Sequence, residues 1–201
     1  MRFLLSSIFL LLVSCAPYPK KQGFSANALS KETLVNPFFS DATKDYVYKS
    51  KITIYDKTLG GILIIKKTAE EQHRIVFTTE MGNTIFDFTL TGEQFKVNRI
   101  LADLDRKIIV KTLQRDFTAL IKENLMATKG FTNGTTTIRQ AKLLGKFHYY
   151  TFENGKLVQI TRTGNTREKV VFRFSGINDN IAQEIQIDHQ NIRLQIGLKS
   201  F

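Results

Sequence analysis

Alternation of apolar and polar residues dominates the chain from about residue 46 to its end, and it constrains the fold more than any other feature. Side chains that alternate in this way point to opposite faces of a β-strand. The pattern is clearest late in the chain, where Val170, Phe172 and Phe174 share one face. The segments that we predict as strands are 46–55, 60–67, 73–80, 84–90, 94–99, 135–139, 147–153, 156–163, 168–175, 183–188 and 192–198.

Short polar links separate these segments, which predicts that neighbouring strands are antiparallel. The links include Thr58-Leu59-Gly60-Gly61, Met81-Gly82-Asn83 and Asn154-Gly155. The last of these is a strong signal for a two-residue hairpin turn.

Residues 103–124 follow a different period, with apolar residues three and four positions apart, which predicts an amphipathic helix. Asp103 is a candidate N-cap for this helix. At ~1.5 Å per residue the helix is about 33 Å long, enough to cross an open end or face of a small barrel.

About eleven antiparallel strands and one long helix predict a mainly β (α+β) protein built on an incomplete antiparallel β-barrel, with the helix laid across it. The space between helix and sheet is either an apolar cavity suited to an acyl chain or a fully packed core. Periodicity alone does not distinguish these two interiors.

The N-terminus has the features of an export signal. Arg2 precedes an apolar run, 3–13, that is too short to span a bilayer comfortably. The run ends in Leu12-Val13-Ser14-Cys15, which resembles the bacterial lipobox and implies that residues 1–14 are removed and Cys15 is lipidated. The alternative is that Cys15 is an ordinary small residue at the end of a secretory signal.

Residues 15–42 contain all three prolines and no clear period, so we predict a lipidated tether, with a first docked turn within 34–39. The folded domain is expected to span 43–201. Ala16 stands where an aspartate would favour retention in the inner membrane, which favours the outer membrane. No acidic run follows, and this favours a domain that faces the periplasm.

The formal net charge is +11. Because the chain carries an export signal, we expect an acidic partner to be anionic lipid or an acidic protein rather than nucleic acid. A basic surface without a specific partner is the plainer alternative.

Catalytic chemistry finds little support. His73, His148 and His189 lie far apart in the sequence, and none has a second ligand at metal-binding spacing. Asp87, between two phenylalanines, is expected to face solvent on the opposite face of its strand. We therefore expect no enzyme, no cofactor and no metal.

One segment carries a family resemblance. The run LIIKKTAEEQHRIVFTTEMGNTIFDF, residues 63–88, resembles the corresponding part of the LolB family of outer-membrane lipoproteins, which accept lipoproteins from the periplasmic carrier LolA. Two later stretches, GKLVQITRTGNTREKVVFRFSG and EIQIDHQNIRLQIGL, look like the closing strands of that family. The resemblance does not extend over 125–146.

The resemblance implies an incomplete barrel with a helical lid, and a non-enzymatic monomer that binds the acyl chains of lipoproteins and releases them into the outer membrane. It implies that Met81, before Gly82, protrudes as a membrane-insertion residue; Glu80 departs from the family, which often has proline there. The residues that we expect to line an acyl cavity are Ile75, Phe77, Phe86, Phe88, Leu113, Phe117, Val170, Phe172 and Phe174.

Two other functions stay open. The chain could be an accessory lipoprotein that binds a protein or an envelope polymer through its surface and has a filled core. A hydrolase has only the export signal in its favour.

Overall fold

The computed structural model describes residues 17–27, 32–164 and 167–201. The predicted signal peptide and Cys15 lie outside the described residues. Within the described part the protein is mainly β, with fourteen strands in one antiparallel sheet and two helices. The strands are β1 (Ser25–Asn27), β2 (Glu32–Val35), β3 (Asp45–Ile54), β4 (Lys57–Ala69), β5 (Gln72–Thr78), β6 (Thr84–Thr91), β7 (Gln94–Ile100), β8 (Asn124–Asn133), β9 (Thr136–Leu143), β10 (Lys146–Glu153), β11 (Lys156–Thr163), β12 (Glu168–Asn178), β13 (Ile181–His189) and β14 (Leu194–Ser200). The helices are α1 (Tyr18–Lys21) and α2 (Lys107–Ile121).

The strand order is β1-β8-β9-β10-β11-β12-β13-β14-β3-β4-β5-β6-β7, and β2 also pairs with β8. Most neighbours in this order are also neighbours in sequence, joined by short turns. One pair near the middle of the sheet is not adjacent in sequence: β14, the last strand, pairs with β3, the first long strand. The sheet is open between its end strands β1 and β7, and closure into a barrel is not confirmed.

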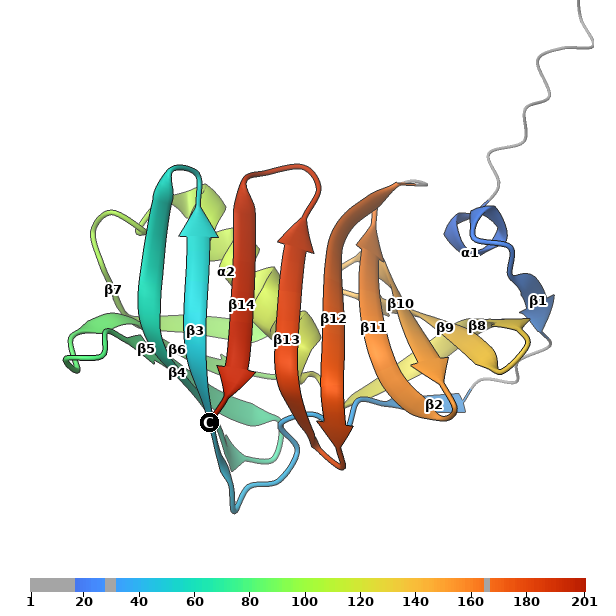
Figure 1. The fold of residues 1–201 in the computed structure, drawn as a ribbon, viewed down its shortest axis with the longest axis horizontal. Coiled ribbons are helices and arrows are strands. Elements are labelled where there is room, and N and C mark those ends of the chain that lie inside the picture. The colour runs from blue at the N-terminus through green and yellow to red at the C-terminus, as the bar shows by residue number, and fades with distance from the viewer. Residues whose placement is uncertain (1–16, 28–31, 165–166) are drawn as a thin grey trace, which may run out of the picture.

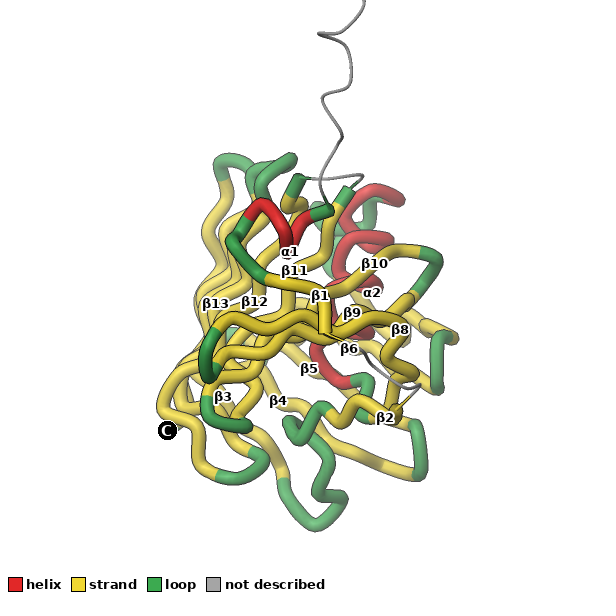
Figure 2. The backbone as a smooth tube through the Cα atoms, turned by 90° about the vertical axis from the view of Figure 1, so that its right-hand side faces the viewer, coloured by secondary structure: helices red, strands yellow, loops and turns green. Residues whose placement is uncertain are grey.

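Helix α2 lies against one face of this curved sheet, which we call the inner face (Figure 1; Figure 2). Inward-pointing residues of the strands pack with the apolar stripe of the helix into one large core. Strand β3 illustrates the cause, because its burial alternates residue by residue, as the sequence predicts. The Asn154-Gly155 hairpin is confirmed, and both residues have positive φ, +48° and +80°.

A second, smaller hydrophobic cluster lies on the opposite, outer face. We call it the outer cluster; its members are Tyr18, Phe24, Phe131, Ile138 and Tyr149. Tyr18 of α1 contributes to it, with its ring centroid 5.0 Å from that of Tyr149. At the right-hand end of Figure 1, α1 lies beside β1, the end strand of the sheet, which pairs with β8.

The described part of 15–42 is therefore packed, and the prediction that it is a tether is wrong for these residues. Leu34, Phe38 and Phe39 are almost fully buried in the main core. The segment predicted as a docked turn, 34–39, is docked, but its first two residues belong to β2 and the turn itself lies at Phe38 and Phe39. The folded domain begins well before residue 43, because these apolar side chains fill the inner face.

All eleven predicted strands are present, but three further strands, β1, β2 and β8, were not predicted. The link predicted at 58–61 is part of β4, and the turn lies at Tyr55 and Asp56 instead. The predicted helix is shorter at both ends, and Arg106 rather than Asp103 is its N-cap. The Asp103 carboxylate instead forms an ion pair with Lys57 at the β3–β4 turn.

Candidate functional site

The predicted cavity-lining residues all lie on the inner face or on α2, and all are buried in the main core. They come from β5, β6, α2 and β12: Ile75, Phe77, Phe86, Phe88, Leu113, Phe117, Val170, Phe172 and Phe174. The sequence thus selected residues that the fold brings to one side of the sheet.

Four of the phenylalanines form one aromatic cluster between β5, β6 and α2. Phe86 stacks on Phe88 with a centroid separation of 4.5 Å, and it lies 5.3 Å from Phe77 and 5.7 Å from Phe117 of α2. These are contact distances for aromatic rings. Phe174 has a different partner, because its ring stacks 4.4 Å from Phe38, which follows β2.

The five most prominent pockets over the described residues are lined by other side chains than these nine. The largest, about 620 Å³, is a hollow lined mainly by polar and small residues of β3, β4, β13 and β14, including Lys49, Lys51, Gly60 and Gly197. A small apolar gap opens instead between α2 and the β3–β4 and β13–β14 turns, at Tyr55, Ile108 and Ile192. In the described structure the space between α2 and the sheet is filled by side chains.

Met81 lies in the loop between β5 and β6 and is 91% exposed. The loop is closed by backbone hydrogen bonds in which the N–H of Thr79 donates to the carbonyl of Asn83 and the N–H of Gly82 donates to that of Thr79, both at 2.9 Å. Gly82 has φ +85°, a conformation that favours glycine. The loop therefore has a defined shape while its large apolar side chain has no packing role.

Gly61 of β4 supports the base of this loop. A Cβ atom on Gly61 would lie 1.9 Å from the carbonyl oxygen of Thr78, the last residue of β5. Only glycine lets the two backbones approach this closely. The sequence predicted Gly61 as part of a turn, so it missed this role.

A buried polar contact joins α2 to the sheet. The imidazole Nε2 of His189, at the end of β13, lies 2.7 Å from Oδ2 of Asp116. Both side chains are about 1% exposed. Burial raises the pKa of Asp116, although the contact with His189 opposes that change. Asp116 Oδ1 and His189 Nδ1 have no hydrogen-bond partner among the described residues.

Two further polar side chains, on β10 and β11, lie in the same row across the sheet as His189. His148 of β10 is opposite Arg162 of β11, and Arg162 is opposite Val170 of β12, which in turn is opposite His189. Burial lowers the pKa of His148 to about 4 and lowers that of Arg162. His148 Nε2 and Arg162 Nε are likewise buried with no hydrogen-bond partner in the described part of the chain. The result is a group of four polar side chains with buried nitrogen or oxygen atoms beside the main core: His148, Arg162, Asp116 and His189.

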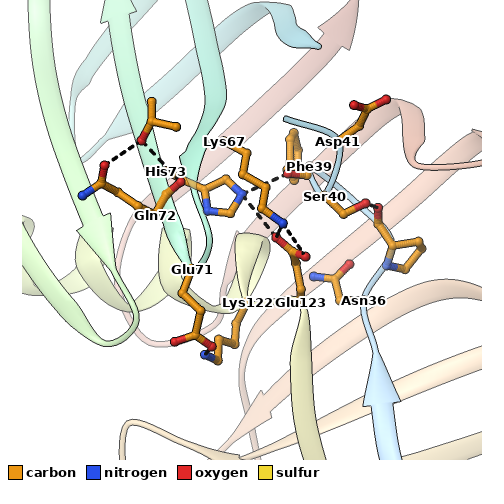
Figure 3. Close-up of polar contacts among 12 residues, drawn as sticks. Asn36, Phe39, Ser40, Asp41, Lys67, Glu71, Gln72, His73, Lys122 and Glu123 are labelled. Carbon is orange, nitrogen blue, oxygen red and sulfur yellow. Dashed lines mark hydrogen bonds and ion pairs between the residues drawn. The ribbon is translucent and has the colours of Figure 1, made fainter. Parts of the chain in front are cut away.

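The end of α2 is held by a second set of polar contacts (Figure 3). The Lys67 ammonium lies 2.7 Å and 2.9 Å from the two carboxylate oxygens of Glu123. His73 Nε2 donates to the carbonyl of Phe39 at 2.9 Å, and Asn36 donates to the carbonyl of Leu120 at the end of α2. These contacts connect α2, β4, β5 and the segment after β2.

Asp116 was not predicted as a site residue, although its position in the sequence indicates a buried carboxylate. Asp116 falls on the apolar stripe of α2, three residues after Leu113 and four before Leu120. A carboxylate at such a position needs a partner, because burying an unpaired charge is costly. The histidines were expected to be structural or solvated, and all three side chains are buried rather than solvated.

Asp87 also differs from its prediction. It lies on the face opposite the phenylalanine rings, as expected, but it is mostly buried and not solvated. Arg74 donates two hydrogen bonds to its carboxylate, at 3.1 Å and 2.7 Å, and lowers its pKa.

The chain matches no known protein-family model, and no curated protein has significant sequence similarity to it. Over the described residues, no cluster of three or more histidine, cysteine or acidic side chains is arranged to hold a metal ion. No helix in the same part of the chain has the length and hydropathy of a membrane-spanning helix.

Proposed function

We propose that this chain is a LolB-like, lipid-anchored protein of the outer membrane that faces the periplasm. It receives the acyl chains of lipoproteins from a LolA-like carrier and releases them into the membrane. In this proposal the open sheet acts as an incomplete barrel, α2 is its lid, and no catalysis or cofactor is involved.

The observation that carries the proposal is Met81. A flexible, apolar side chain stands 91% exposed in a loop whose backbone is fixed by its own hydrogen bonds. Neither turn geometry nor the core calls for an apolar residue there. An exposed methionine is suited to enter an apolar environment such as a bilayer.

Acyl uptake then requires α2 to move away from the sheet, because side chains fill the interior. In this proposal the separation begins at the small apolar gap beside Tyr55 and Ile108, where α2 meets the strand turns. Handover to the membrane consumes no external energy if the interior binds an acyl chain less tightly than the bilayer does, because each methylene gains ~0.8 kcal/mol in either environment.

The test is transfer of a triacylated lipopeptide from the protein to liposomes. Met81→Glu should leave folding and lipopeptide uptake near the wild-type level and reduce transfer at least tenfold, because a carboxylate is costly to place in lipid. Phe201→Glu is the matched control, since Phe201 is also a highly exposed apolar residue.

Phe201→Glu should transfer the lipopeptide at the wild-type rate. Unchanged transfer by a folded Met81→Glu protein would remove Met81 from the mechanism. Equal loss in both variants would mean that added negative charge, and not the position of Met81, is responsible.

The filled interior favours a second candidate function, an accessory lipoprotein that binds a protein or an envelope polymer through its surface. In that case the nine inner residues are only core. Depletion of the protein separates the two functions, because mislocalised lipoproteins are expected only for the first.

A further inference from the structure

The outer face of β8, β9 and β10 carries apolar side chains that no other part of the described chain covers. Met126 is 54% exposed, Phe147 is 48% exposed and Val35 of β2 is 53% exposed. They are three of the nine large apolar residues that are exposed in the described structure, and β2, β8 and β10, which carry them, lie in one part of the sheet, with only β9 between β8 and β10.

The strand register places these residues together. Phe147 is opposite Lys142, and Thr33 is opposite Met126. Ala127 is opposite Ala141, so Met126 and Lys142 are adjacent on β8 and β9. Met126, Lys142 and Phe147 therefore form one row across β8, β9 and β10, with neighbouring strands about 4.8 Å apart.

The direction of the side chains follows from their neighbours. Ala127, Ala141 and Leu143 belong to the main core on the inner face. Met126 and Lys142 alternate with them, so they point outward, and Phe147 shares the face of its partner Lys142. Val35 alternates with the buried Leu34 and also points outward.

Two cations accompany the apolar residues. Lys129 lies two positions before Phe131 of the outer cluster and on the same face, and Lys142 lies between Met126 and Phe147. Both ammonium groups are exposed, and neither forms an ion pair with any described residue. We call Val35, Met126, Lys129, Lys142 and Phe147 the outer patch.

We propose that the outer patch binds the surface of a membrane that contains anionic lipids. Its exposed phenylalanine, methionine and valine can enter the interfacial layer while its lysines remain at the level of the phosphates. The exposed apolar side chains stand in a row with the lysines beside them, a composition that matches the acyl chains and anionic headgroups of a lipid surface.

The position of the N-terminal segment supports a lipid surface. The outer patch continues into the outer cluster, since Phe147 and Tyr149 are on the same face of β10, and Tyr18 of α1 packs on Tyr149. Cys15, the predicted lipidation site, precedes Tyr18 by three residues, which span about 10 Å at most. A lipid on Cys15 would therefore hold this face close to the membrane.

This inference rests on the membrane location in the proposed function but not on acyl transfer. Residues 17–201 contain every described element and both hydrophobic clusters, and this part is used for the test once its circular dichroism spectrum shows that it is folded. Its binding to vesicles of phosphatidylcholine with 30% phosphatidylglycerol is measured by flotation, beside vesicles of phosphatidylcholine alone.

Wild-type protein should bind the anionic vesicles and lose binding at high salt. Replacing both Lys129 and Lys142 by Gln should weaken binding about 25-fold, at about fivefold per lysine. Met126→Ser with Phe147→Ser should weaken it roughly tenfold or more, with an unchanged circular dichroism spectrum.

The matched control is Lys51→Gln with Lys156→Gln, two exposed lysines outside the patch that also lack ion pairs with described residues. Control binding near the wild-type level supports the outer patch. Equal loss in the control means that only net charge attracts the protein, which overturns the proposal. The proposal is also overturned if the wild-type protein does not bind the vesicles, or if both patch variants bind them as well as the wild type does. Binding of an acidic protein to the same patch would assign the surface to that class of partner instead.

Lipopeptide transfer is measured in parallel. Both proposals are supported if the patch variants bind vesicles more weakly and Met81→Glu loses lipopeptide transfer. Normal vesicle binding by the patch variants, with transfer lost in Met81→Glu, overturns the outer patch alone.

Discussion

At the scale of single residues, His148 shows how burial changes chemistry. Its Nδ1 donates to the carbonyl of Lys146 at 3.2 Å, and its Nε2 is buried without a partner among the described residues. Burial, with a smaller contribution from the Arg162 charge, lowers its pKa to about 4. The ring is therefore neutral in the folded protein at neutral pH.

This makes stability depend on pH in a defined direction. The unfolded chain binds a proton on this imidazole near pH 6.5, whereas the folded protein does so only near pH 4, so the unfolded state gains protons first as pH falls. Stability should decrease from pH 6.5 to pH 4, by about 3 kcal/mol from this group.

Urea unfolding across this range measures the effect. His148→Gln should flatten the pH dependence, whatever its stability at pH 7. Burial also lowers the pKa of His73, so part of the slope should remain. The same slope in wild type and variant would show that His148 does not stay neutral in the folded state.

At the scale of elements, periodicity predicted the long, regular strands and failed where geometry departs from regularity. Strand β8 was missed because a bulge between Ala127 and Lys129 interrupts its alternation. Strands β1 and β2 are too short to form a pattern. Asp103 was assigned as a helix cap because sequence does not show that Lys57 lies opposite it in the fold.

The contact between α2 and β13 leads to a prediction at the same scale. Asp116→Ala should reduce the free energy of unfolding by about 3–5 kcal/mol, because it leaves the buried His189 without its partner. Asp116→Leu combined with His189→Leu should recover most of this loss, since apolar residues can replace a buried pair. Denaturant unfolding of the single and double variants measures both free energies of unfolding. If Asp116→Ala lowers the free energy of unfolding by less than about 1 kcal/mol, the pair does not hold α2 to the sheet.

At the scale of the whole molecule, the sequence predicted a mainly β fold with one long helix and placed the candidate inner residues on one face. It could not predict that β14 pairs with β3, because no local pattern records a contact between distant segments. It also could not distinguish a lined cavity from a filled core. Phe86 and Phe117 fit either prediction, and only their 5.7 Å separation identifies them as packed in this state.

The central claim is that this filled interior opens to accept acyl chains. Binding of a fluorescent fatty acid to residues 17–201, with competition by a triacylated lipopeptide, tests it most directly. The account predicts saturable binding that the lipopeptide displaces and the same peptide without acyl chains does not. Absence of saturable binding, or displacement by both peptides alike, would contradict it and leave a protein whose inner residues form only a core.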